Sequence, residues 1–151
     1  MNTYATTGTR TSNVSASPDQ SRLTSMTATA KFAELAGRIF LSALFLLSGV
    51  GKIGSYAATA GYMSSVGVPG ALLPAAIAVE VFGALAIILG WKTRITALLL
   101  AGFTMLTAFA FHNNFSDQIQ MIMFLKNVSI AGGFLLLVAN GAGPLSLDRR
   151  S

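Results

Sequence analysis

Cysteine is absent from the chain, and histidine occurs only once. Without cysteine, the chain can form no disulfide, no cysteine-ligated zinc site, no iron–sulfur cluster and no thiol redox centre. A single histidine also cannot supply both axial ligands of a bis-histidine haem. The sequence therefore predicts no metal site and no cofactor held covalently or by a metal-binding motif.

Charged residues are also scarce. They make up 10% of the chain, whereas soluble domains carry about 25%. Hydrophobic residues make up 53%, and they occur in long blocks with little interruption. Because such a chain has too few charges to cover a water-exposed surface, the composition indicates that most of it is solvated by a lipid bilayer.

Four apolar blocks approach or exceed the length of about 20 residues that a helix needs to cross a bilayer core of about 30 Å. They lack the alternation of transmembrane β-strands and are rich in Ala, Leu and Gly. The blocks cover residues 32–53, 71–90, 95–111 and 119–139. We therefore expect an all-α membrane protein with a four-helix transmembrane bundle over residues 31–141.

The segments outside these blocks have a different composition. Residues 1–30 are dominated by Thr, Ser and Ala, and such a segment buries too little apolar surface to offset its ordering entropy. We expect a disordered cytoplasmic tail over residues 1–30 and a short cytoplasmic tail over residues 142–151. Between the first two blocks, residues 54–70 are predicted to form an interfacial loop, with Tyr56 and Tyr62 at headgroup depth.

The Lys and Arg residues predict the orientation of the bundle. Cytoplasmic loops of membrane proteins are enriched in these residues, and alternating four helices through the membrane places nearly all of them on one side. We therefore expect both termini in the cytoplasm, with Arg38, Lys92 and Arg94 in structural or lipid-anchoring roles. Anionic lipid headgroups account for the net charge of +5, and no basic, aromatic-rich soluble face indicates a nucleic-acid partner.

Ionisable residues inside the blocks are the candidate functional groups, because each costs several kcal/mol in hydrocarbon. The same topology brings four of them, from four different helices, into the outer half of the membrane. We expect these four to form a ligand-binding or proton-relay site, with Glu80 paired to Lys126. The candidates are Glu80, Lys126, His112 and Lys52. No residue is assigned a catalytic role.

The first helix has a polar face that the spacing predicts. Arg38, Ser42, Phe45, Gly49 and Lys52 follow one another at intervals of four, three, four and three residues, which keeps them on one side of a helix. That side is expected to face the bundle interior. Three alternatives stay open: Lys52 extends to the interface, His112 is an ordinary interfacial residue, and the Glu80–Lys126 pair is purely structural.

Seven short motifs, in order along the chain, resemble the DoxX family of small four-helix membrane proteins. The matching strings are Gly37-Arg38-Ile39-Phe40-Leu41, Leu47-Ser48-Gly49-Val50-Gly51-Lys52, Tyr62-Met63 with Gly67-Val68-Pro69, Glu80, Gly90 with Thr93-Arg94, Phe111-His112, and Phe124-Leu125-Lys126-Asn127. The resemblance implies a multi-pass protein of the bacterial inner membrane. Members of this family are often described as oxidoreductases or quinone-linked subunits.

Three functions remain open at this stage. In the first, the outer-half cluster binds a quinone or similar amphiphile: Lys126 or His112 bonds a carbonyl oxygen, Glu80 exchanges the proton, and a redox partner subunit supplies electrons. In the second, the protein is a membrane scaffold whose ion pair fixes helix register. In the third, the cluster belongs to a proton or small-solute path, which four helices would support more readily in a homo-oligomer.

Overall fold

The computed structural model describes residues 18–149, and all regular structure within that range is helical. Four segments of this part of the chain are long and apolar enough to cross a membrane: Thr27–Gly54, Gly70–Leu89, Thr93–Phe111 and Gln118–Asn140. The prediction of an all-α protein with four transmembrane helices is confirmed. The elements are α1 (Pro18–Gly54), α2 (Tyr56–Ser65), η1 (Gly70–Leu72), α3 (Leu73–Leu89), α4 (Thr93–Phe111), α5 (Gln118–Asn140) and η2 (Leu147–Arg149).

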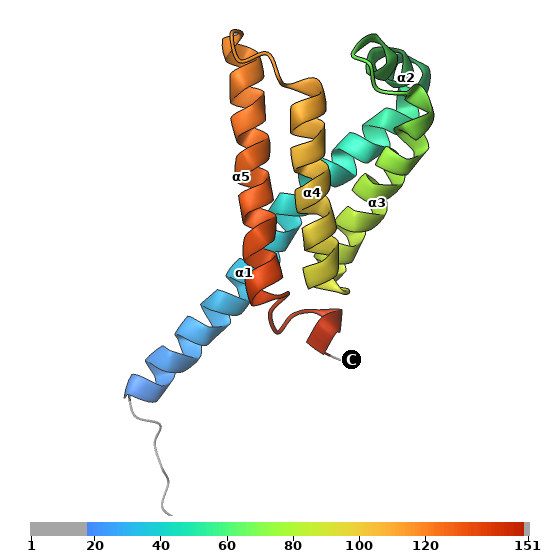
Figure 1. Ribbon diagram of the computed structural model, residues 1–151. Coiled ribbons are helices and arrows are strands. Elements are labelled where there is room, and N and C mark those ends of the chain that lie inside the picture. Colours follow the sequence, from blue (N-terminus) through green and yellow to red (C-terminus); the bar gives the residue numbers. More distant parts are fainter. Residues whose placement is uncertain (1–17, 150–151) are drawn as a thin grey trace, which may run out of the picture.

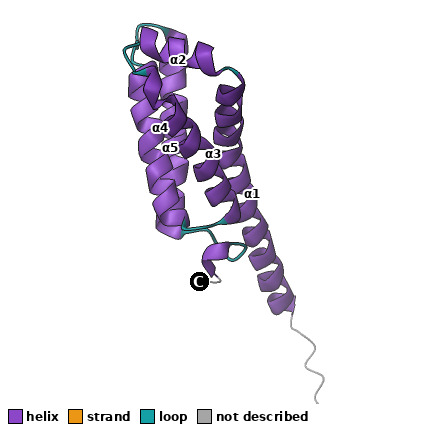
Figure 2. Cartoon of the chain, turned by 90° about the vertical axis from the view of Figure 1, so that its right-hand side faces the viewer, coloured by secondary structure: helices purple, strands orange, loops and turns teal. Residues whose placement is uncertain are grey.

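The four long helices are arranged as two pairs. Helix α1 packs mainly against α3, and α4 packs mainly against α5. In Figure 1, α1 crosses behind α4 and α5 diagonally and runs beside α3, and α2 lies at the end where α1 finishes. Figure 2 shows the two pairs side by side from a second direction. We call the end where α3 and α5 finish the Arg38 end, and the end where α4 finishes the His112 end.

The apolar core lies in the half of the bundle nearer the Arg38 end. Phe45 of α1 and Phe134 of α5 meet edge to face, with ring centroids 5.3 Å apart, and buried side chains of α3 and α4 surround them. Gly83 of α3 faces Leu100 of α4 so closely that a Cβ at Gly83 would lie 2.9 Å from the Leu100 Cδ2. Small residues thus let the helices pack tightly in this half.

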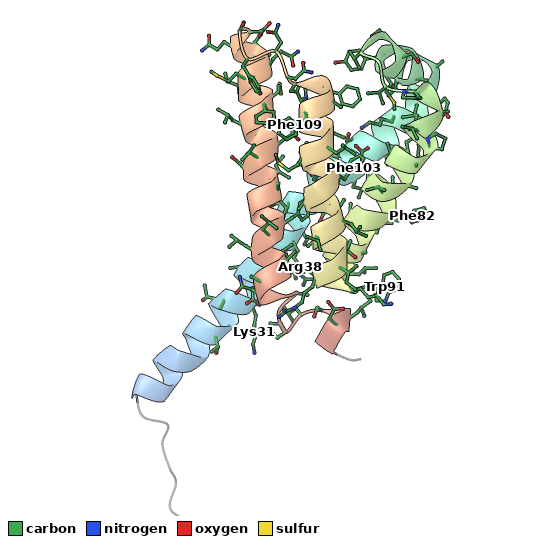
Figure 3. The ribbon with its side chains drawn as sticks, in the orientation of Figure 1. Lys31, Arg38, Phe82, Trp91, Phe103 and Phe109 are labelled. Carbon is green, nitrogen blue, oxygen red and sulfur yellow. The ribbon has the colours of Figure 1, made fainter. Side chains whose placement is uncertain are left out.

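Large apolar side chains cover the outside of the bundle. Phe40, Phe82 and Leu106 are 78%, 70% and 70% exposed, and Figure 3 shows Phe82 pointing away from the other helices. An apolar surface of this extent is unusual for a soluble monomer. It is the surface expected of helices that contact lipid.

The Arg38 end is closed by hydrogen bonds at the helix termini. Helix α3 ends at Gly90, whose φ of 68° is left-handed and favours glycine. Arg38 is 1% exposed, and its guanidinium donates to the carbonyl oxygens of Ile87 at 3.2 Å, Ile88 at 3.1 Å, and Leu145. Arg38 therefore caps the C-terminus of α3 from inside the protein. Of its two predicted roles, structural or lipid-anchoring, these contacts fit the structural one.

The C-terminal residues are part of this closed end. The Asp148 carboxylate accepts hydrogen bonds from the backbone N–H groups of Lys92 at 2.6 Å and Thr93 at 2.8 Å, and its own N–H donates to the Gly90 carbonyl at 2.8 Å. The described residues 142–149 of the predicted short C-terminal tail pack against the bundle, while its cytoplasmic location stays a prediction. They pack here because the first N–H groups of α4 and the last carbonyls of α3 need partners.

Two other segments differ from the sequence-based expectation. Helix α1 begins at Pro18, so residues 18–30 are helical rather than disordered, while residues 1–17 lie outside the described residues. Extending an existing helix requires no new nucleus. Residues 54–70 include the ten-residue helix α2 where an interfacial loop was expected.

Candidate functional site

A cavity of about 320 Å³ lies between the two helix pairs, in the half nearer the His112 end. Side chains from all five α-helices line it, and Figure 3 shows Phe103 on α4 at the side that faces α1 and α3. Most of the wall is apolar. Its polar side chains include Ser48, Lys52, Glu80, Thr107, His112 and Asn127. The cavity therefore combines an apolar interior with a small number of convergent hydrogen-bonding groups, as ligand sites do.

The central polar feature is an ion pair between α1 and α3. The Lys52 Nζ donates to both carboxylate oxygens of Glu80, at 2.8 Å each, and to the Ser48 Oγ at 2.5 Å. Ser48 in turn donates to the Glu80 Oε1 at 3.3 Å. The Glu80 side chain is 7% exposed and that of Lys52 is 26% exposed. The pair is thus mostly buried, and both of its side chains line the cavity.

The local geometry of α1 explains why Lys52 reaches Glu80. Helical Cα–Cβ bonds tilt toward the N-terminus, so the Lys52 side chain at the end of α1 leans back along its own helix, over Ser48. Gly49 lies on the same side, and a Cβ there would lie 2.7 Å from the Val81 Cγ2. Glycine at this position therefore lets α1 and α3 approach closely beside the ion pair.

The inward face predicted for α1 is confirmed. Arg38, Ser42 and Phe45 are 1%, 0% and 6% exposed, Gly49 is buried, and Lys52 is half-buried. The alternative in which Lys52 extends to the membrane surface is wrong, because its ammonium is held by Glu80 and Ser48.

His112 lines the cavity at the end of α4. Its Nδ1 lies 2.8 Å from the Gln120 Oε1, which accepts a hydrogen bond in the tautomer that carries a proton on Nδ1. Gln120 is held in the first turn of α5, where the Asp117 carboxylate accepts from the N–H groups of Ile119 at 2.7 Å and Gln120 at 3.2 Å. This N-cap positions the partner of the imidazole.

The predicted pairing of Glu80 with Lys126 was wrong. Lys126 is on the exposed side of α5, and its Nζ lies 3.9 Å from the Met123 Sδ. The adjacent residue, Asn127, is half-buried and lines the cavity instead. Neighbouring residues of a helix are about 100° apart around its axis. If the inward face of a helix is assigned one residue away from its true position, a side chain on the lipid side is taken for an interior one.

Asn127 is one of the polar cavity residues that sequence reasoning missed, together with Ser48 and Thr107. The inward side of α5 carries Gln120, Phe124, Asn127, Ala131 and Phe134, which are spaced by four, three, four and three residues. This is the same pattern that identified the inward face of α1. It is less visible in α5, because apolar residues occupy every side of that helix.

Lys92 and Arg94 lie at the Arg38 end, outside the cavity. Both side chains are exposed, and the Lys92 Nζ lies 5.7 Å from the centre of the neighbouring Trp91 ring. Lys92 also has a positive φ of 45°, at the residue before α4 begins. Their predicted role, structural or lipid-anchoring, stays a prediction.

The sequence matches known proteins over the part that carries this geometry. The DoxX family model matches residues 33–113, which include Ser48, Lys52, Glu80 and His112. The inner membrane protein YqjF of Escherichia coli (strain K12) is 52% identical, over 76% of this chain and 88% of the relative. The chain belongs to the DoxX family. It is an integral inner-membrane protein.

A second relative extends the comparison for this DoxX-family protein. The inner membrane protein YphA of Escherichia coli (strain K12) is 43% identical, over 77% of this chain and 88% of the relative. No solved structure matches the chain significantly. The family match ends at residue 113, so it covers the ion pair and His112 and leaves the Asn127 wall of the cavity outside.

Proposed function

We propose that this DoxX-family protein binds a quinone or a similar small amphiphile in the His112-end cavity, as an accessory subunit of a membrane oxidoreductase system. The observation that carries the proposal is the placement of the Lys52–Glu80 pair. Burying an ion pair costs desolvation that the attraction between the charges only partly offsets, so a pair that only joined two helices would add little stability. This pair instead borders a cavity, where the partly exposed Lys52 can meet a ligand.

The residues fit a quinone ring by size and by donor chemistry. A volume of about 320 Å³ is at the lower end of the range of about 300–1,000 Å³ typical of small-molecule sites. The Lys52 ammonium is a hydrogen-bond donor suited to a carbonyl oxygen, which would replace the Ser48 Oγ as one of the three acceptors of its N–H groups. Apolar and aromatic walls, including the stacked rings of Tyr62 and Phe111 with centroids 5.8 Å apart, suit the ring itself.

The chain's own polar groups have distinct tasks in this proposal. Lys52 orients a ligand oxygen, and Glu80 holds Lys52 in place and delivers a proton to the quinone oxygen as electrons from the partner reduce the quinone. His112, at the end of the cavity nearer the membrane surface, exchanges protons through its imidazole. A bound quinone supplies two-electron redox chemistry. Because the chain contains no cysteine and no cofactor motif, we propose that the electrons come from a partner subunit.

The competing function is a scaffold, and one observation favours it. Gly49 and the ion pair both lie where α1 and α3 meet, so the pair fixes the register of these helices whether or not a ligand binds. The two functions predict different outcomes when the charge is removed without loss of folding.

The test is equilibrium binding of a ubiquinone analogue to the protein in lipid nanodiscs. Lys52→Met is expected to lower the affinity by about tenfold or more, the effect of losing one charge-assisted hydrogen bond. Lys126→Met is the matched control, since it removes a lysine from the lipid-facing side of α5, and it is expected to bind as the wild type does. Equal affinities for all three proteins, or no binding by the wild type, would contradict the proposal.

We also propose that the Arg38 end faces the cytoplasm, with the cavity in the outer half of the membrane. The lysine and arginine distribution supports this orientation. The chain has no cysteine, so single cysteines at Lys92 and Asn114 can be labelled without background. An impermeant thiol reagent added to intact cells should label Asn114→Cys and spare Lys92→Cys. Labelling of Lys92→Cys and not of Asn114→Cys would show that the bundle has the opposite orientation.

A further inference from the structure

A second cavity of about 220 Å³ adjoins the cavity beside the ion pair. The two share part of their walls, from α2, α3 and α4. The shared residues are Met63, Ala76, Phe103, Thr107 and Phe111. The His112 end therefore has two adjoining parts, and the ionic groups line only the first.

The second part is suited only to hydrocarbon. Thr107 is its single polar side chain, and the Thr107 hydroxyl already donates to the Thr104 carbonyl at 3.0 Å. The other side chains that line it are aliphatic or aromatic, or the thioether Met63. A polar ligand group placed here would lose its hydrogen bonds to water without replacement, whereas an alkyl or isoprenoid chain would lose nothing.

This apolar part extends to the lipid-facing surface between α3 and α4. Its wall includes Leu72, Val79 and Leu106, which are 53%, 37% and 70% exposed. The small side chains of Ala75 and Ala110 on α3 and α4 leave the space between these helices unfilled. The helices touch at Gly83 and Leu100 nearer the Arg38 end, and Figure 1 shows them diverging from there.

We infer that the ligand of this protein is a head-and-tail amphiphile whose single hydrocarbon chain leaves the site between α3 and α4. The inference rests on the proposed function, and it adds the ligand class and the route of entry. The head lies beside Lys52, and the chain passes Phe103 and Ala110 into the bilayer. The ligand enters sideways from the leaflet at the His112 end, and a ring without a chain occupies only the first cavity.

The test blocks the chain path without touching the head site. Ala110→Phe places a ring in the second cavity, and Ala110 does not line the first. Ala139→Phe makes the same change at an exposed position of α5 and is the matched control. The probes are decyl-ubiquinone and the same dimethoxy-methyl benzoquinone ring without a chain, each titrated into nanodiscs. Comparing variant with wild type for each probe cancels the different partitioning of the two probes into lipid.

Ala110→Phe is expected to weaken decyl-ubiquinone binding by about tenfold or more, the size expected for overpacking an apolar site. Binding of the chainless ring should stay within about twofold of wild type, and Ala139→Phe should leave both affinities unchanged. Equal weakening of both probes, or no weakening of either, would overturn the inference while leaving the proposed function intact.

A wild type that binds neither probe would contradict the proposed function itself. A second measurement then decides the inferred ligand class: mass spectrometry of molecules that co-purify with the wild type and with Ala110→Phe. A chain-bearing molecule enriched in the wild type and lost in Ala110→Phe supports the chain path for another headgroup. Equal retention by both proteins, or no retained molecule, would overturn the inference as well.

Discussion

The two ends of the bundle use charged side chains in opposite ways. At the Arg38 end, Arg38 and Asp148 bond to backbone groups at the ends of α3 and α4, and these bonds close the protein. At the His112 end, Lys52 and Glu80 bond to each other and border a cavity. The first arrangement gives hydrogen-bond partners to the backbone N–H and C=O groups that have none at helix ends. The second holds ionic groups beside a cavity, so the proposed function assigns stability to one end and ligand binding to the other.

The largest effect is expected from breaking the Arg38 end. Arg38→Met removes hydrogen bonds to three carbonyl oxygens, each worth about 1.5–3 kcal/mol because the donor is charged. The free energy of unfolding should fall by about 5 kcal/mol, and Arg38→Lys should recover only part of it, since an ammonium lacks the planar fork of guanidinium. Thermal unfolding in detergent measures the loss. Stability close to wild type in Arg38→Met would show that the cap is dispensable.

A smaller effect is expected where α1 and α3 meet beside the ion pair. In Gly49→Ala the new Cβ would lie 2.7 Å from the Val81 Cγ2 and 3.2 Å from the Glu80 Cβ, so the helices must separate at a cost of about 1–3 kcal/mol. Gly51→Ala is the matched control on the same helix, because nothing lies within 4 Å of its Cβ. It should stabilise the protein by about 0.5–1 kcal/mol. Equal thermal stability of the two variants would contradict the close approach.

The smallest effect concerns pH and the Asp148 carboxylate. Partial burial raises the pKa of Asp148. Hydrogen bonds from Thr93 and Lys92 and the nearby Arg38 charge together lower this pKa by more than burial raises it, so the net pKa is below its usual 3.8. A lowered pKa in the folded state adds stability that is present above the unfolded pKa and lost as pH falls through the folded pKa.

Wild type should therefore exceed Asp148→Asn in stability by less than about 1 kcal/mol near neutral pH, because the carboxyl is largely exposed. The difference should shrink below a pH of about 4. Thermal unfolding of both proteins across this range is the measurement. A difference that grows as the pH falls would contradict the assigned hydrogen bonds.

The four transmembrane helices and the inward face of α1 could be predicted from the sequence, whereas the inward face of α5 and the partner of Glu80 could not. Block length and composition suffice for four transmembrane helices, since the bilayer sets both. The spacing from Arg38 to Lys52 identified the inward face of α1, because polar residues mark it. Helix α5 has no such contrast, so Lys126 was chosen where Asn127 faces the cavity.

The partner of Glu80 was missed for a different reason. Choosing Lys52 over Lys126 requires knowing which helices pack together, and the α1–α3 contact depends on the close approach at Gly49. The spacing of Ser48 and Lys52 by four residues was a local signal for a shared polar site. Orientation of the bundle, the ligand and the partner subunit stay predictions.

The central claim is that Lys52 and Glu80 form a ligand site and do more than hold α1 to α3. The most direct measurement compares Lys52→Met, Glu80→Gln and the double variant for thermal stability and for quinone-analogue binding in nanodiscs. Either single change leaves a buried group without its partner and should cost about 3–5 kcal/mol, whereas the double change should restore most of the stability. The account predicts a double variant that is folded and stable yet binds at least about tenfold more weakly, for loss of the charge-assisted contact to the ligand. A stable double variant that binds with wild-type affinity would contradict the site and leave the ion pair as a packing device.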